Sequence, residues 1–248
     1  MIRTLVQAGA LSLLALPATA LDLARMSDAE RSLFRAEVRS YLLDHPEVIM
    51  EAVELLQQRE ASAEAAQDRA LIDALRREIF DDGYSWVGGN PEGDITLVEF
   101  VDYRCGYCRR AHEEVKELVA GDGNIRLIYK EFPILGEASM RSSRFAVAVK
   151  QLAGDDAYAR VHDALITLKA EPTDAVLSRL AGQLGLEAAA IFARMPSDAV
   201  SQEIAGTRAL AQALSISGTP TFVMQDQMLR GYLPLDAMQA LVAEKRDR

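Results

Sequence analysis

Cysteine is scarce in this chain: Cys105 and Cys108 are the only two among its 248 residues. A disulfide between them would close a ring of four residues. The chain-entropy relation gives such a ring about 2 kcal/mol of stabilisation, compared with about 3 kcal/mol for a 15-residue loop. The pair is therefore poorly placed to act as a structural cross-link.

Basic clusters, phosphate-binding loops and internal repeats are also missing. The formal net charge is −10, and an acidic surface without a basic cluster argues against nucleic acid or an anionic membrane as partner. No glycine-rich loop of the phosphate-cradling kind is present. A covalent c-type haem needs histidine directly after the second cysteine, where this chain has Arg109. We therefore expect no bound cofactor beyond the cysteine pair.

The N-terminal apolar run, from residue 5 to 16, is too short for a membrane span, which needs about 20 residues. Arg3 precedes it, and the small residues Ala18-Thr19-Ala20 follow it. This order is typical of a secretory signal peptide. We expect residues 1–20 to be removed by cleavage near Ala20, and no cysteine follows the run to make a lipoprotein. An exported chain of this kind works in an oxidising compartment.

The two cysteines form the motif Cys105-Gly106-Tyr107-Cys108, between an apolar run at 95–101 and a helical pattern from Arg109 onward. A strand followed by C-x-x-C at the start of a helix is the arrangement of a redox dithiol. Unpaired N–H groups at a helix N-terminus favour the Cys105 thiolate, so Cys105 is the predicted nucleophile. Cys108, one turn further on, would resolve the mixed disulfide. The alternative interpretation is two inert packed thiols.

The rest of the chain divides into helical and strand-forming stretches. Residues 21–80 are predicted to be helical, with a break at His45-Pro46. Turn residues over 81–94 indicate a linker. The main domain, 81–248, is predicted to contain strands at 95–101 and 125–131, a helical block at about 138–214, a strand hairpin at 218–231 and a last helix at about 234–245. This order predicts an α/β thioredoxin-like fold with a helical insertion and an N-terminal helical extension.

Two separate motifs, the run from Val98 to Cys108 and Gly218-Thr219-Pro220-Thr221-Phe222, resemble the DsbA family of exported thiol-disulfide oxidoreductases. The resemblance extends from about Asn90 to the C-terminus. The N-terminal extension, the Gly-Tyr dipeptide and Thr219 resemble the copper-sensitivity suppressor ScsC branch of that family. DsbA itself is known for Pro-His between its cysteines and Val before its proline. The isomerase DsbC has the same residues as this chain at these positions, Gly-Tyr between its cysteines and Thr before its proline.

The resemblance implies roles for further residues. It implies that Pro220 follows a cis bond and faces the dithiol, leaving the Thr219 main chain free to pair with a substrate strand. Gly106 and Tyr107 would then lie against the substrate. It also implies that Glu99 is a proton relay beneath the dithiol, with Lys130 as a possible partner. On the residues alone, Pro220 could instead open an edge strand, and Glu99 could face solvent.

Three histidines remain. His112 completes a C-x-x-C-x-x-x-H pattern, which suggests copper or zinc, but a closed four-ligand site is not available and a helix-surface position is the alternative. His45 and His162 are interpreted as helix-surface or boundary residues.

The predicted function is thiol-disulfide exchange in the bacterial periplasm, as an isomerase or an oxidase. Its partners would be unfolded or misfolded exported proteins and a membrane thiol-disulfide redox partner. A copper-handling dithiol protein and a chaperone-like binding protein are the alternatives. The extension would either fold back on its own domain or assemble the chain into a homo-oligomer through residues 21–80.

Overall fold

The computed structural model describes residues 25–247, which fall in two compact units divided between Arg59 and Glu60. The predicted signal peptide, residues 1–20, lies outside the described residues. None of the helices in the described part of the chain is both long and apolar enough to span a bilayer.

The first unit contains α1 (Asp28–Asp44) and the first part of α2 (Glu47–Ala74). Ser27 caps α1 in a capping box, in which the Glu30 backbone N–H donates to the Ser27 hydroxyl and the Ser27 N–H donates to the Glu30 carboxylate. The helices separate at His45-Pro46, as the sequence predicts. Between residues 28 and 59 no described residue is buried. These helices therefore expose their apolar side chains.

The end of α2 and α3 (Arg76–Phe80) belong to the second unit. Ile72 and Ile79 are fully buried there, in a cluster with Val98 and Phe100 of the sheet. The division between the compact units therefore comes about twenty residues before the domain boundary expected near residue 80.

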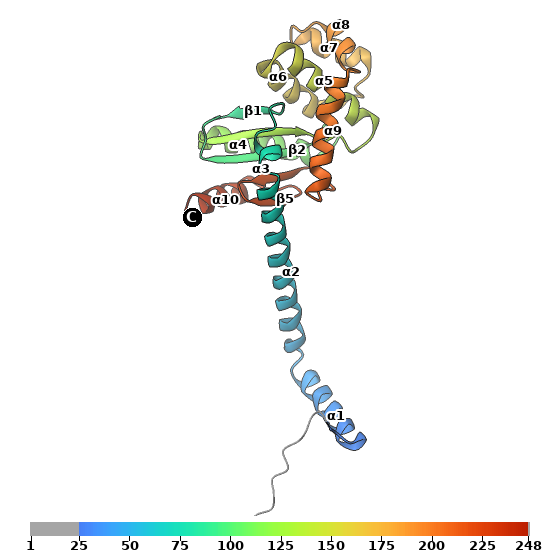
Figure 1. Cartoon of the computed structure of the whole chain (residues 1–248), viewed down its shortest axis with the longest axis vertical. Helices are drawn as coiled ribbons and strands as arrows, with labels where there is room; N and C mark the ends of the chain where they lie inside the picture. The colour runs from blue at the N-terminus through green and yellow to red at the C-terminus, as the bar shows by residue number, and fades with distance from the viewer. Residues whose placement is uncertain (1–24, 248) are drawn as a thin grey trace, which may run out of the picture. The chain divides into compact units, whose positions relative to one another are not determined.

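A five-stranded sheet of order β1-β3-β2-β4-β5 organises the second unit (Figure 1). β2 and β3 are parallel, and the other neighbours are antiparallel. The strands are β1 (Trp86–Gly89), β2 (Ile95–Val101), β3 (Ile125–Glu131), β4 (Thr221–Met224) and β5 (Gln227–Arg230).

β1 corrects the prediction that the turn residues over 81–94 mark a linker at the entry to the main domain. Trp86 pairs with Tyr129 of β3 at the edge of the sheet. Gly88 and Gly89, which the sequence suggested as a turn, are the last two residues of this strand. Only glycine fits at these positions, because a side chain at Gly88 would meet the Trp86 ring and one at Gly89 would meet the Ile125 carbonyl. Gly89 also has a φ of +67°, which favours glycine. The glycines serve close packing here.

Helices cover both faces of the sheet. α4 and the C-terminal α10 contribute buried side chains to one face, and α3 and α9 to the other. Helices α5 to α9 form the predicted insertion between β3 and β4 (Figure 1). The bounds are α4 (Gly106–Asp122), α5 (Glu137–Ala153), α6 (Asp155–Thr167), α7 (Asp174–Gln183), α8 (Ala188–Arg194), α9 (Asp198–Ala213) and α10 (Leu235–Arg246).

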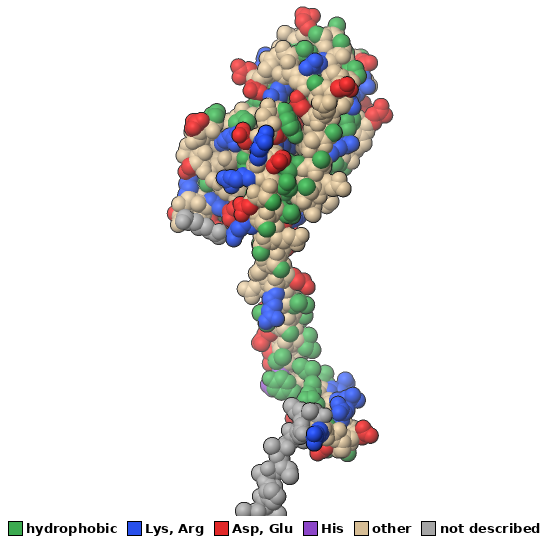
Figure 2. All heavy atoms as spheres, in the orientation of Figure 1, with side chains coloured by type: hydrophobic (Ala, Val, Ile, Leu, Met, Phe, Trp, Pro, Cys, Tyr) green, Lys and Arg blue, Asp and Glu red, His purple; other side chains and the backbone are tan. Residues whose placement is uncertain are grey.

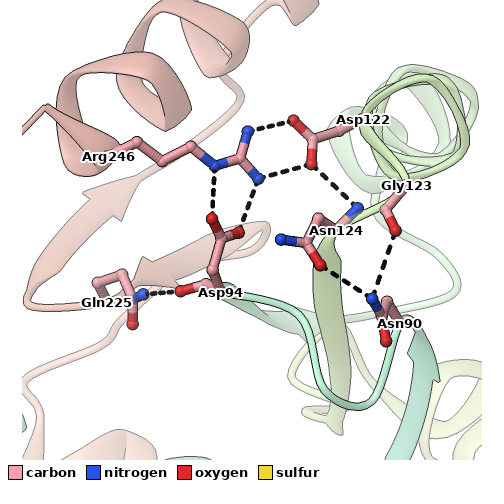
Figure 3. A network of polar contacts seen from close by, with 7 residues as sticks. All are labelled: Asn90, Asp94, Asp122, Gly123, Asn124, Gln225 and Arg246. Atoms are coloured by element: carbon pink, nitrogen blue, oxygen red, sulfur yellow. Dashed lines mark hydrogen bonds and ion pairs between the residues drawn. The ribbon is translucent and has the colours of Figure 1, made fainter.

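Arg246 fastens the end of α10 to two other parts of the unit. Its guanidinium forms paired hydrogen bonds with Asp94, before β2, and with Asp122, at the end of α4 (Figure 3). Nearby, the Asn90 amide donates to Asn124 Oδ1 at 2.9 Å and to the Gly123 carbonyl. Bidentate arginine–carboxylate pairs fix orientation as well as distance. These contacts hold the β1–β2 loop against the α4–β3 loop.

Candidate functional site

Cys105 is the N-cap of α4, and Cys108 lies in its first turn. The Cys108 backbone N–H donates to the Cys105 sulfur at 3.4 Å, as a helix N-terminus allows. Both cysteines are free thiols. Cys105 keeps 6% exposure whereas Cys108 has none. Of the two, Cys105 is the one that an incoming sulfur can reach.

The surroundings separate the acidities of the two thiols. Hydrogen bonding from the Cys108 thiol, helped by contacts with Thr219 and the backbone N–H groups of Cys108 and Tyr107, lowers the pKa of Cys105 to about 5 against the effect of burial. Burial, with the nearby Cys105 and Glu99, raises the pKa of Cys108 far above its ordinary value. At neutral pH Cys105 is therefore a thiolate and Cys108 a thiol.

The second predicted motif meets the first in space. The Thr219-Pro220 bond is cis, as the resemblance implies. The Cys105 sulfur lies 3.1 Å from the Thr219 carbonyl oxygen, although 114 residues separate them in sequence. The loop that carries Thr219 and Pro220 therefore lies directly beside the Cys105 sulfur.

Glu99 is 2% exposed, so the solvent-facing alternative is wrong. It shares its face of β2 with Leu97 and Val101, because side chains alternate along a strand, and that face is the one that packs on the cysteines. Burial, and then the charge on Cys105, raises the pKa of Glu99 to about 8.

Lys130 is not the partner of Glu99. It pairs in register with Phe100, and therefore lies on the opposite face of the sheet. Its ammonium instead donates to Asp82 at 2.5 Å and to the Glu78 carbonyl at 2.8 Å.

The surface around the dithiol includes residues that sequence reasoning missed. Tyr107 is 62% exposed, and its ring stacks on Tyr232, with 6.4 Å between centroids. The Arg110 guanidinium lies over the same Tyr232 ring at 4.4 Å. The Tyr232 hydroxyl donates to Glu114. Tyr232 lies far from the cysteines in sequence, so no local signal could have placed it there.

A second group that the sequence did not reveal shapes the loop before Cys105. The fully buried Asp102 carboxylate accepts from the backbone N–H groups of Arg104, Ile134 and Leu135. Arg109 donates to the Tyr103 and Leu168 carbonyls, which joins the loop to the end of α6. An aspartate directly before a turn is a usable signal, since it caps turns in this way.

The surface interpretations of His112 and His162 are wrong, because the two side chains are 4% and 1% exposed. Helix α6 of the insertion packs on α4, so both are covered. His112 Nε2 contacts Asp163 at 3.1 Å, and His162 Nδ1 contacts the Tyr103 hydroxyl at 3.0 Å. Within residues 25–247, no three potential ligands form a metal-binding group. His45 is the exposed C-cap of α1, as expected for a boundary residue.

Comparison with known proteins agrees with this geometry. Residues 96–243, more than half of the chain, match the DSBA-like thioredoxin domain, and residues 30–63 match the copper resistance protein ScsC N-terminal domain. The Na(+)/H(+) antiporter NhaA 3 of Salinispora tropica is 29% identical over 185 residues, or 73% of this chain. That match spans 28% of the antiporter's length.

Among solved structures, a thioredoxin-like oxidoreductase from Silicibacter pomeroyi is 40% identical, with a TM-score of 0.65 over 70% of this chain and 98% of that one. The thiol-disulfide exchange protein alpha-DsbA2 from Wolbachia pipientis is 28% identical, with a TM-score of 0.68 over 73% of this chain and 97% of that one. By its fold and by the family match over residues 96–243, the chain belongs to the DsbA-like thioredoxin family.

Proposed function

We propose that this protein is an exported thiol-disulfide oxidoreductase that exchanges disulfides with protein substrates through Cys105 and Cys108. The observation that carries the proposal is the Cys105 sulfur at a helix N-terminus, with a pKa of about 5, lying 3.1 Å from the Thr219 carbonyl. The similarity to two solved structures, a thioredoxin-like oxidoreductase and a thiol-disulfide exchange protein, supports it.

The reaction follows from the two acidities. The Cys105 thiolate attacks one sulfur of a substrate disulfide, so that a mixed disulfide forms and the other substrate sulfur leaves as a thiolate. Cys108 then loses its proton and attacks Cys105, which releases the second substrate thiolate and leaves the enzyme oxidised. Run in reverse, the same steps transfer a disulfide to a reduced substrate. Direction depends on the reduction potentials of the two partners.

Glu99 is proposed as the acceptor of the Cys108 proton. The charge on Cys105 is one cause of its raised pKa, and this charge disappears when Cys105 enters a mixed disulfide. The pKa of Glu99 then falls, so its carboxyl releases a proton to solvent and becomes a carboxylate that can accept the proton of Cys108.

Glu99→Gln is expected to slow resolution of the mixed disulfide at least tenfold at pH 7, since general-base catalysis is typically worth about 10²-fold or more. The decay rate of a trapped mixed disulfide measures this effect. Glu117→Gln, an exposed acid on the same helix as Cys108, is the control. Unchanged decay in Glu99→Gln would assign Glu99 a purely structural role.

The proposed substrate surface consists of Gly106, Tyr107, Thr219 and the neighbouring Tyr232. An extended substrate chain would pair with the main chain at Thr219, which brings its sulfur to Cys105. The exposed Tyr107 ring and the half-buried Tyr232 ring on which it stacks suit unfolded chains, which present apolar side chains. Unfolded or misfolded exported proteins are therefore the proposed substrates, and a membrane thiol-disulfide protein of the periplasm would restore the redox state of the dithiol.

The experiment that tests the function is reactivation of a protein with scrambled disulfides, compared with oxidation of the same protein in its reduced form. Reactivation supports an isomerase and oxidation supports an oxidase. Inactivity in both assays, with stoichiometric Cu(I) binding, would favour the copper-handling alternative, for which a thiolate pair is a suitable soft ligand set.

Residues 21–80 are proposed to assemble the chain into a dimer or trimer. Large apolar side chains are exposed all along α1 and the start of α2, including Leu33 at 72%, Tyr41 at 53% and Leu56 at 56%. Figure 2 shows hydrophobic side chains, in green, gathered where α1 meets the start of α2. Contiguous exposed apolar surface of this kind indicates an interaction site. Several dithiols in one assembly would raise the local concentration of reactive sulfur near a misfolded chain, which suits isomerisation.

Light scattering on the mature protein is expected to give two or three times its monomer mass, which is smaller than the 27.2 kDa of the full chain by the mass of residues 1–20. Phe34→Glu combined with Val53→Glu is expected to give monomers, because charge on an apolar interface opposes association. Gln57→Glu, exposed on the same helix as Val53, should leave the assembly intact. A monomeric wild-type chain would show that the extension does not self-associate.

A further inference from the structure

A hollow of about 520 Å³ lies on the helical insertion, where α5, α7 and α8 pack together (Figure 1). Its apolar lining consists of Met140 of α5, Phe192 of α8, and Met195 and Pro196 between α8 and α9. Met140 and Phe192 are half-buried, so part of each side chain remains uncovered. Methionine side chains are flexible and adapt to different apolar partners. This insertion hollow can therefore accept large apolar side chains of different shapes.

The charged groups around the insertion hollow balance each other. Arg141 pairs with Asp174. The Arg144 guanidinium donates to the Met195 carbonyl at 2.9 Å. Glu137 supplies the second acid in the lining. Because two arginines and two acids leave no net charge, the hollow favours a neutral apolar group over a charged one.

A second hollow, of about 380 Å³, adjoins the first. Glu137, Arg141 and Asp174 line both hollows. The second is completed by Ala138 of α5 and by residues 171–173, which precede α7. Because they share three lining residues, the two hollows form one continuous depression, which we call the insertion groove.

One end of the insertion groove reaches the loop that carries Cys105. Glu171, which lines the groove, lies 3.6 Å from the guanidinium of Arg104, the residue before Cys105. Leu135, two residues before α5 begins, donates its backbone N–H to Asp102 at 3.0 Å, and its side chain is 53% exposed. Both sides of the groove therefore begin beside the dithiol loop, and Leu135 adds apolar surface at this end.

We propose that the insertion groove holds an extended segment of a substrate protein, adjacent in sequence to the cysteine that Cys105 attacks, and that a large apolar side chain of this segment fills the insertion hollow. The inference rests on the proposed function, because the occupant is the disulfide substrate of the dithiol. Continuity of the groove with the loop that carries Cys105 selects this occupant. None of the residues of the substrate surface proposed above is among the described residues that line the groove. The groove therefore adds a second contact region, in which any large apolar side chain gains by leaving water.

The ε-methyl groups of Met140 and Met195 report occupancy directly, because both residues line the insertion hollow. The mature Cys105→Ser, Cys108→Ser protein, labelled with ¹³C at its methionine methyls, excludes thiol chemistry. A neutral unfolded peptide that contains phenylalanine should shift both peaks saturably, and the same peptide with serine for each phenylalanine should bind at least about fivefold more weakly. A shift of neither peak, or equal binding of both peptides, overturns the proposal. A shift of Met50 alone, in α2, would place the peptide on the extension and also overturn it.

A charge in the insertion hollow provides the second test. Met140→Glu should slow formation of the mixed disulfide between Cys105 and an unfolded protein disulfide at least about fivefold, since it places a carboxylate where the substrate's apolar side chain binds. Its reaction with oxidised glutathione, which brings no long chain, should match that of the parent. Leu152→Glu, at a 48% exposed position of the same helix, is the matched control and should react like the parent with both substrates.

Capture of the unfolded protein by Met140→Glu at the parent rate overturns the proposal, and so does an equal loss of rate toward oxidised glutathione. A parent protein that exchanges no disulfides would contradict the proposed function alone, because the methyl shifts of the serine variant do not depend on thiol chemistry and decide the groove by themselves.

Discussion

Replacing Cys105 with serine is expected to abolish turnover of protein disulfides, whereas Cys108→Ser should trap substrates as mixed disulfides on Cys105. The serine hydroxyl at position 105 cannot form the first mixed disulfide, so no later step can occur. In Cys108→Ser the first step proceeds, but no internal thiol remains to release the substrate. Non-reducing electrophoresis distinguishes the two variants directly.

The physical basis of this asymmetry is the separation of the two pKa values. Cys105 receives stabilising hydrogen bonds at the α4 N-terminus, while Cys108 is completely buried one turn further on. Alkylation of the reduced protein should therefore modify Cys105 with half-maximal rate near pH 5 and leave Cys108 almost unmodified at neutral pH. Mass spectrometry after brief alkylation at pH 6 measures both sites at once.

Two results would contradict the assignment. Equal alkylation of the two thiols at pH 6 would show that the helix N-terminus does not select Cys105. Full activity of the doubly substituted chain, with serine at positions 105 and 108, would support the chaperone-like alternative, in which the extension supplies the working surface.

The sequence predicted the fold well because the elements that define it are local in sequence. The apolar runs of β2 and β3, the break at His45-Pro46 and the capping box at Ser27 are patterns that can be recognised within a few residues. β1 was missed because Gly88 and Gly89 are ordinary turn residues. Only the position of the Trp86 ring shows why this strand needs them. Close packing between segments leaves no local signal.

In the candidate site too, local sequence patterns were predictive, and contacts between distant segments were not. Spacing was sufficient to identify Cys105 and Cys108 as a dithiol. The family resemblance predicted that Thr219 and Pro220 lie beside them. The prediction that Lys130 could pair with Glu99 was wrong. The strand register decides which face of the sheet a side chain occupies, and the sequence does not give the register. His162 was misplaced because most of its cover comes from three rings distant in sequence, Tyr103, His112 and Tyr129, which join Tyr158 one turn earlier in α6.

Asp82→Ala is expected to destabilise the protein by about 3–5 kcal/mol, the largest effect on stability among the substitutions considered. Lys130 is fully buried, and its ammonium lies 2.5 Å from the Asp82 carboxylate. Removing one member of a buried ion pair leaves the other charge without compensation, and this accounts for the size of the loss. Asp82 also accepts hydrogen bonds from the backbone N–H groups of Tyr84 and Ser85, so its loss loosens the turn before β1.

Chemical denaturation measures this loss, and Asp81→Ala, which changes the exposed neighbouring acid, should cost less than about 0.5 kcal/mol. The double variant Asp82→Asn, Lys130→Met should recover much of the stability, because it removes both charges and keeps similar volumes. A loss as large as that of Asp82→Ala in the double variant would show that the uncompensated charge of Lys130 is not the cause of the destabilisation.

The pH dependence provides an independent check on the same pair. Burial opposes ionisation of Asp82, but Lys130 and the Ser85 hydrogen bonds outweigh it and lower the pKa of Asp82 in the folded protein. A group with a lowered folded pKa contributes its full stability above its unfolded pKa, about 3.9 for aspartate, and loses that contribution as the pH falls through the folded value. The difference in stability between the parent and Asp82→Ala should therefore be constant from pH 5 to 7 and shrink below about pH 4. A difference that stays constant at pH 3 would show that the ionised carboxylate is not the stabilising group.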